Sequence, residues 1–280
     1  MNRPPCGLRT RLLPLCLCAG LFLSGCSATG VERQTPPPVS PTPAPTATPT
    51  PTPAPTPTPT PEPTLPPYDY AQPAPETDPV EDAWFQDAVF VGDSRTDGLR
   101  LYGGVKGADF ICYKGLTAFE FDNKACIERD GKKVTALEAL SEKTYGKVYV
   151  MLGLNELGYS TEEFAKGYAT LIDQVRQAQP NAVLYFQSVV PVNPQKCQEK
   201  KQPYYISNEK VAQFNAEITR LAEEKQVVFL NVADGLTDED GILPYDSTSD
   251  GVHFSKDWYR TWFSYVKNHT VDPERLEVSE

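Results

Sequence analysis

One serine, one histidine and one aspartate are placed where they could form a nucleophilic centre. Gly92-Asp93-Ser94 directly follows the apolar residues 88–91, so Ser94 would stand at a strand-to-helix turn with its hydroxyl exposed. A serine hydroxyl is a weak nucleophile until a base takes its proton, and histidine is the usual base. His253 follows Asp250 by three residues, and an aspartate there can orient the imidazole and stabilise the imidazolium. We therefore predict Ser94 as nucleophile, His253 as general base and Asp250 as its partner. The competing interpretation is that Gly-Asp-Ser is an ordinary turn or helix cap, and that His253 is a loop histidine beside an incidental acid.

Two further segments could supply hydrogen-bond donors to a developing oxyanion. Asn155 lies in Gly153-Leu154-Asn155-Glu156, directly after the apolar residues 147–152, and its amide could donate to such an oxygen. Gly115 follows the second apolar stretch and could add a backbone N–H, beside the N–H of Ser94 itself. The alternative is that Asn155 is a turn or helix-cap residue. The other histidine, His269, is near the end of the last predicted helix, where a cation favours the helix dipole, so we predict a structural role for it.

Apolar stretches that alternate with helical patterns must position these groups. Strands are predicted at 88–91, 109–113, 147–152, 182–190 and 227–231, and helices at 94–101, 160–179, 207–225 and from 255 onward. Ser160 with Glu163 predicts a capping box at the start of the second of these helices. The alternation predicts a parallel sheet covered by helices on both faces. Such a sheet binds its ligand at the carboxyl ends of the strands, where the candidate residues fall.

The order of these blocks resembles the SGNH (GDSL-like) hydrolase family. Gly-Asp-Ser, a glycine, Gly-x-Asn and Asp-x-x-His follow one another over residues 88–253, which is nearly the whole predicted domain. The resemblance implies a flavodoxin-like α/β three-layer sandwich with a central parallel sheet of about five strands. It also implies esterase or acetylesterase chemistry without a metal or other cofactor. Its catalytic residues carry over as Ser94, His253 and Asp250, with the Ser94 N–H, the Gly115 N–H and the Asn155 amide as oxyanion donors.

Two positions depart from the pattern that is common in this family. Arg95 stands after the serine, where leucine is frequent, and Glu156 stands after the asparagine, where aspartate is frequent. Both are therefore candidate substrate-binding residues. In one interpretation they form an ion pair that rigidifies the two loops, which we favour. In the other, Arg95 clamps a substrate carboxylate with its planar fork of donors.

The first 80 residues have the pattern of an export signal followed by a spacer. Arginines precede the apolar residues 12–22, and Leu23-Ser24-Gly25-Cys26 resembles a bacterial lipobox, in which the cysteine is acylated after cleavage. Sixteen of the 28 prolines lie between residues 35 and 67, so this tract can form neither helix nor sheet. We predict a signal peptide at 1–25, a lipidated Cys26 with a Pro/Thr-rich disordered stalk at 26–80, the hydrolase domain at 81–270 and an acidic tail at 271–280. At ~3.1 Å per residue the tract could reach roughly 100 Å.

Charge and cysteine usage restrict the partners. A net charge of −11 without a basic stripe argues against nucleic acid. Outside the export segment only Cys112, Cys126 and Cys197 remain, and none has the spacing of a zinc site. Two arrangements are compatible with the sequence: a disulfide between Cys112 and Cys126, or three free thiols.

These observations lead to one expected function and two alternatives. We expect an extracytoplasmic serine esterase, anchored to the bacterial cell membrane through lipid on Cys26. The expected substrate is an acyl ester, in particular an O-acetyl group, on peptidoglycan or another wall or extracellular polysaccharide. The alternatives are an acyltransferase that uses the same serine and a non-catalytic wall-binding lipoprotein.

Overall fold

The computed structural model describes residues 66–276. The predicted signal peptide, the lipidation site Cys26 and the spacer up to residue 65 lie outside the described residues, as do the last four residues. Within the described part, no helix is long and apolar enough to cross a membrane.

A five-stranded sheet forms the centre of the domain, and all its strand pairs are parallel. The spatial order is β2-β1-β5-β6-β7, which is the doubly wound order of flavodoxin-like sheets. The topological switch point therefore lies between β1 and β5, where ligands bind in such folds. The strands are β1 (Ala88–Gly92), β2 (Asp109–Cys112), β5 (Lys147–Met151), β6 (Val183–Gln187) and β7 (Val228–Leu230). All five lie where the sequence predicts them.

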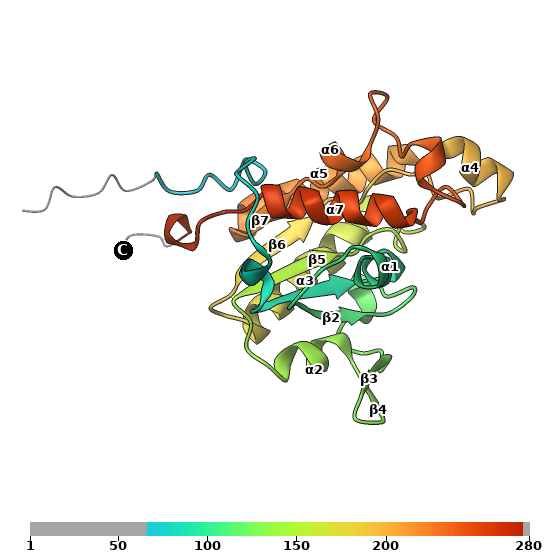
Figure 1. Ribbon diagram of the computed structural model, residues 1–280. Coiled ribbons are helices and arrows are strands. Elements are labelled where there is room, and N and C mark those ends of the chain that lie inside the picture. The colour runs from blue at the N-terminus through green and yellow to red at the C-terminus, as the bar shows by residue number, and fades with distance from the viewer. Residues whose placement is uncertain (1–65, 277–280) are drawn as a thin grey trace, which may run out of the picture. The chain divides into compact units, whose positions relative to one another are not determined.

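Helices cover both faces of this sheet, as Figure 1 shows. One face carries α2 (Ala136–Ser141), α3 (Thr161–Ala178) and α5 (Asn208–Lys225), and the other carries α1 (Ser94–Tyr102), α6 (Ala233–Leu236) and α7 (Lys256–Asn268). The capping box of Ser160 and Glu163 is present at the start of α3. The predicted flavodoxin-like three-layer sandwich is confirmed. The remaining elements are β3 (Ile127–Arg129), β4 (Lys132–Val134), α4 (Pro194–Glu199) and four short 3-10 turns, η1 (Asp82–Phe85), η2 (Ala118–Glu120), η3 (Tyr245–Ser247) and η4 (Pro273–Arg275).

An aromatic row across four strands packs one face of the sheet. Strand side chains alternate between faces, so register alone brings Phe110, Phe90, Tyr149 and Tyr185 onto the side of α1 and α7. Neighbouring rings stack with centroids 5.4, 4.8 and 4.5 Å apart. These cross-strand pairs fix the register, and the register places the ends of β1 and β5 side by side.

The domain begins earlier, and ends later, than the sequence suggests. Tyr68 and Ala74 are buried in the core beside α7, and Val271, predicted to belong to a tail, is fully buried. Backbone N–H groups of residues 68, 74, 77 and 80 donate to carbonyls of Arg275, Phe229, Asn268 and Lys267. The predicted boundaries at 81 and 270 were therefore wrong. A segment without periodicity still packs where its backbone finds partners and its few apolar side chains find a complementary surface.

The first and last described residues meet at one end of the sheet. Tyr68 N–H donates to the Arg275 carbonyl, and the segment before β1 follows the carboxyl-terminal end of α7. That helix begins three residues after His253 and runs for 13 residues, a length of about 20 Å. Both chain ends of the described domain therefore lie opposite the carboxyl ends of the strands (Figure 1).

Candidate active site

The turn after β1 exposes Ser94 at the first residue of α1. Asp93 is the helix N-cap, and its Oδ1 accepts a hydrogen bond of 2.8 Å from the Arg95 N–H. Gly92 lets the helix start close to the sheet, because a Cβ there would lie 2.1 Å from Thr96 Oγ1 and 2.5 Å from the Met151 carbonyl oxygen. The Ser94 N–H thus stands at a helix N-terminus, where the dipole favours negative charge.

Ser94, His253 and Asp250 form one hydrogen-bonded chain across 159 residues of sequence. The Ser94 Oγ lies 2.9 Å from His253 Nε2, and His253 Nδ1 lies 2.7 Å from Asp250 Oδ2. An ionised carboxylate only accepts hydrogen bonds, so Nδ1 carries the proton and Nε2 accepts from the Ser94 hydroxyl. This is the geometry that the predicted nucleophile, base and orienting acid require.

Asp250 is held ionised by the loop that carries His253. Partial burial alone would raise the pKa of this carboxyl, but hydrogen bonds from the His253 side chain and from the His253 and Val252 backbone hold it well below its usual value. Oδ1 accepts both of these backbone N–H groups, at 2.8 and 2.9 Å. The carboxylate therefore keeps its charge at neutral pH and can stabilise a developing imidazolium.

Asn155 lies against the Ser94 turn, as the switch-point position predicts. Its Nδ2 donates to Asp93 Oδ2 at 2.9 Å and to the Leu116 carbonyl at 3.1 Å. Both amide hydrogens are thus engaged, and an oxyanion would have to share one of them in a three-centre bond. Gly115 is exposed, with φ of +78°, on the loop after β2. The oxyanion roles of Asn155 and Gly115 remain predictions.

Asp93 is a further site residue, with a role that the sequence motifs do not indicate. It is 1% exposed, and burial raises its pKa, which the N–H and the charge of Arg95 partly oppose. Its two oxygens bind the start of α1 and the Asn155 amide, so it connects the two halves of the switch point. Its position directly before a helix was the available signal, because aspartate is a preferred N-cap.

Arg95 does not bind substrate, and it forms no ion pair with Glu156. Its side chain is 1% exposed, and it donates to the Val252 carbonyl at 3.0 Å and to the Val190 carbonyl at 2.7 Å. The guanidinium also lies over the Phe254 ring, 4.8 Å from the centroid. Neither the ion pair nor the substrate clamp is present, because Nε and Nη1 donate to backbone carbonyls of two distant loops, while the buried Nη2 has no hydrogen-bond partner among residues 66–276. Arg95 thereby holds the residue next to His253.

Glu156 is likewise buried and cannot meet a substrate. It is 0% exposed, and its Oε1 accepts a 2.6 Å hydrogen bond from the Ala118 N–H. Burial raises its pKa to about 8; the Ala118 N–H opposes the rise and the Asp93 carboxyl adds to it. Glu156 is therefore mainly a neutral acid near pH 7. It joins the loop after β5 to the loop after β2, which carries Gly115.

The remaining candidate residues are the three cysteines, His269 and possible metal ligands. Cys112, Cys126 and Cys197 are free thiols, so no disulfide joins Cys112 to Cys126. His269 caps the end of α7, contacts the Tyr265 carbonyl through Nδ1 and stacks on the Tyr265 ring, which confirms its structural role. Within residues 66–276, no group of three or more His, Cys, Asp or Glu side chains could hold a metal ion.

Comparison with known proteins decides the family. The model of the GDSL-like lipase/acylhydrolase family matches residues 90–261, which is more than half of the chain. The protein belongs to this family. Membership in the GDSL-like family indicates a hydrolase of ester bonds, and the resemblance seen in the sequence is confirmed. No curated protein matches the chain.

Solved structures agree with this GDSL-like fold. A candidate platelet activating factor from Streptococcus pneumonia is 22% identical with a TM-score of 0.53, covering 66% of this chain and 89% of its own. A candidate lipolytic protein of the G-D-S-L family from Desulfitobacterium hafniense is 18% identical with a TM-score of 0.50, covering 65% of this chain and 98% of its own. At these identities the likeness concerns the fold.

Proposed function

We propose that this GDSL-like protein is a serine esterase that removes O-acetyl groups from peptidoglycan or another extracytoplasmic polysaccharide. The observation that carries the proposal is the unbroken chain from Ser94 Oγ through His253 to Asp250, with separations of 2.9 and 2.7 Å. Ser94 is partly accessible, as a nucleophile must be. A connected nucleophile, base and orienting acid has no evident purpose in a protein that only binds.

The geometry gives a two-step reaction. His253 Nε2 takes the hydroxyl proton as Ser94 Oγ attacks the acyl carbonyl, and Asp250 stabilises the imidazolium that results. The oxyanion lies at the N-terminus of α1, with the Ser94 N–H, the Gly115 N–H and the Asn155 amide as its donors. His253 then protonates the leaving alcohol, and afterwards activates a water molecule that hydrolyses the acyl-serine.

The N-terminal part of the sequence supports the proposed substrate and location. The lipobox-like Leu-Ser-Gly-Cys26 supports a lipid anchor in the bacterial cell membrane, and the proline tract supports an extended spacer. Residues 68–80, which follow the spacer in the chain, contact the end of the domain opposite the catalytic strand ends. This leaves the catalytic end of the domain accessible to a wall glycan.

The test measures acetate release by the purified full-length protein from acetylated peptidoglycan and from p-nitrophenyl acetate. We expect Ser94→Ala and His253→Ala each to abolish both activities, and the double variant to be no worse than either single one, because the two groups act as a unit. Wild-type kcat/KM in the Ser94→Ala protein would refute the serine mechanism. Transfer of acetate to an added sugar instead of water would identify an acyltransferase. Loss of fatty-acid labelling in Cys26→Ala tests the anchor.

A further inference from the structure

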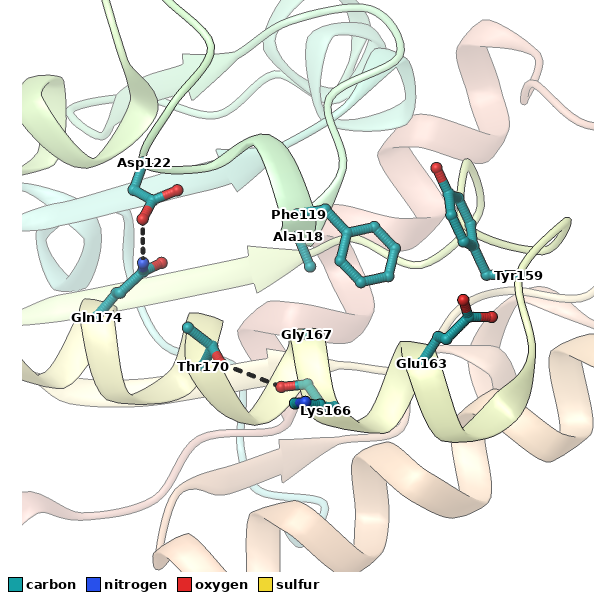
Figure 2. A pocket seen from close by; sticks show the side chains of 9 residues that line it. All are labelled: Ala118, Phe119, Asp122, Tyr159, Glu163, Lys166, Gly167, Thr170 and Gln174. Carbon is teal, nitrogen blue, oxygen red and sulfur yellow. Dashed lines mark hydrogen bonds between the residues drawn. The ribbon is translucent and has the colours of Figure 1, made fainter.

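An open groove lies beside the candidate active site, and no member of the Ser94 chain lines it. Its cavity volume is about 460 Å³, which is within the usual range for small-ligand sites. The turn η2 and the loop after β5 form one wall, and one side of α3 forms the other (Figure 2). Its lining consists of Ala118, Phe119, Asp122, Tyr159, Glu163, Lys166, Gly167, Thr170 and Gln174.

Two aromatic rings form one end of this groove. Phe119 and Tyr159 face each other with centroids 4.8 Å apart and planes inclined by 53°, as Figure 2 shows. Tyr159 is 47% exposed, so much of its surface is accessible to a ligand. Gly167 makes room for the Phe119 ring on α3, since a Cβ there would lie 2.3 Å from Phe119 Cε1.

Polar groups line the remainder of the groove. Gln174 Nε2 donates to Asp122 Oδ2 at 2.7 Å, which leaves the Gln174 carbonyl oxygen available (Figure 2). Among the described residues the Lys166 ammonium has no ion-pair partner. With Asp122 and Glu163, the lining holds two carboxylates and one ammonium, so its net charge is slightly negative.

The groove and the candidate oxyanion site share their two loops. Phe119 follows Gly115 by four residues, and Tyr159 follows Asn155 by four, so in each pair the two Cα atoms lie within about 14 Å of each other. The Glu156 bond to the Ala118 N–H and the Asn155 bond to the Leu116 carbonyl hold these loops together. A ligand in the groove is therefore positioned relative to Asn155.

We propose that this groove binds an uncharged sugar ring of the polysaccharide, adjacent to the ring that carries the ester. The inference rests on the proposed function and specifies its substrate class. A pyranose has an apolar face of C–H groups that can pack on Tyr159, and a rim of hydroxyls that can bond to Gln174 and Lys166. An acyl chain would exclude water from the Lys166 ammonium, which has no ion-pair partner among residues 66–276, without offering it a hydrogen-bond acceptor. The carboxylate of a charged sugar would face two carboxylates and one ammonium, so the net charge of the lining disfavours it.

Binding of unacetylated oligosaccharides tests this inference without turnover. Chitotetraose and xylotetraose are titrated into the full-length protein, and Kd is measured by calorimetry. We expect at least one of them to bind, Tyr159→Ala to weaken that binding about tenfold or more, and Tyr159→Phe to retain it, because the ring supplies the contact. Tyr102→Ala is the matched control, since Tyr102 is an exposed tyrosine outside the groove, and it should bind as the wild type does.

The outcomes separate the two proposals. Binding that is unaffected by Tyr159→Ala, or no binding of either oligosaccharide, overturns the inference. Binding of octanoate that is weakened by Tyr159→Ala, without binding of either oligosaccharide, would assign the groove to an acyl chain instead. That result also overturns the inference. The serine esterase proposal is judged independently, by Ser94-dependent release of acetate.

Discussion

Replacing Glu156 with glutamine should change how the stability of the domain depends on pH. Glu156 is fully buried, its Oε1 accepts the Ala118 N–H, and its Oε2 has no hydrogen-bond partner among residues 66–276. Burial raises its pKa from 4.5 to about 8. The folded protein therefore keeps this proton over a pH range in which the unfolded chain has lost it.

The sign and the size of the effect follow from proton linkage. Between pH 4.5 and 8 the folded state binds one more proton at this site than the unfolded state, so the free energy of unfolding falls as pH rises. The slope is about 1.4 kcal/mol per pH unit for one group, or roughly 5 kcal/mol as an upper bound over the whole interval. The stability from the protonated acid is fully present below pH 4.5 and lost by about pH 8.

Glutamine keeps the acceptor for Ala118 and has no proton to lose. We expect Glu156→Gln to match the wild type near pH 5 and to exceed it increasingly toward pH 8, as measured by urea unfolding at unit pH intervals. Glu128→Gln, at an exposed glutamate on β3, is the matched control and should follow the wild-type curve. Parallel curves for Glu156→Gln and wild type from pH 5 to 8 would refute the reasoning.

Three further predictions concern the groups that hold the site. Arg95→Met should lower the free energy of unfolding by roughly 2–5 kcal/mol in urea, because it leaves the Val190 and Val252 carbonyls buried and unpaired; a loss below about 0.5 kcal/mol would contradict this. Asn155→Ala should lower kcat by roughly 10²–10³ with little change in KM, as loss of an oxyanion donor does; an unchanged kcat with a raised KM would make it a substrate-binding residue. A chain that starts at Glu81 should have a free energy of unfolding roughly 3 kcal/mol lower than one that starts at Pro66, because it loses the buried Tyr68 and the neighbouring backbone hydrogen bonds. Equal midpoints of urea unfolding for the two chains would show that residues 66–80 add no stability.

The sequence alone was sufficient for the sheet and for the chemical groups at its edge. The period of apolar residues reports burial along each strand and helix, so the five parallel strands could be predicted from local patterns. Asp250 and His253 are three residues apart, and their pairing is closed within one loop by backbone N–H groups. Ser94 follows β1 directly, so its place at the carboxyl edge needed only the direction of the strand.

Tertiary structure alone decided what the charged neighbours do. Arg95 and Glu156 are charged residues, which are expected at the surface from their type alone because burying a charge without partners is costly. Their partners are the carbonyls of Val190 and Val252 and the N–H of Ala118, which come from other loops and carry no signature in side-chain type. The same holds for residues 68–80, whose backbone bonds to β7, η4 and the end of α7 give no periodic pattern. Backbone partners are supplied by every residue alike, so only the folded chain shows which ones meet.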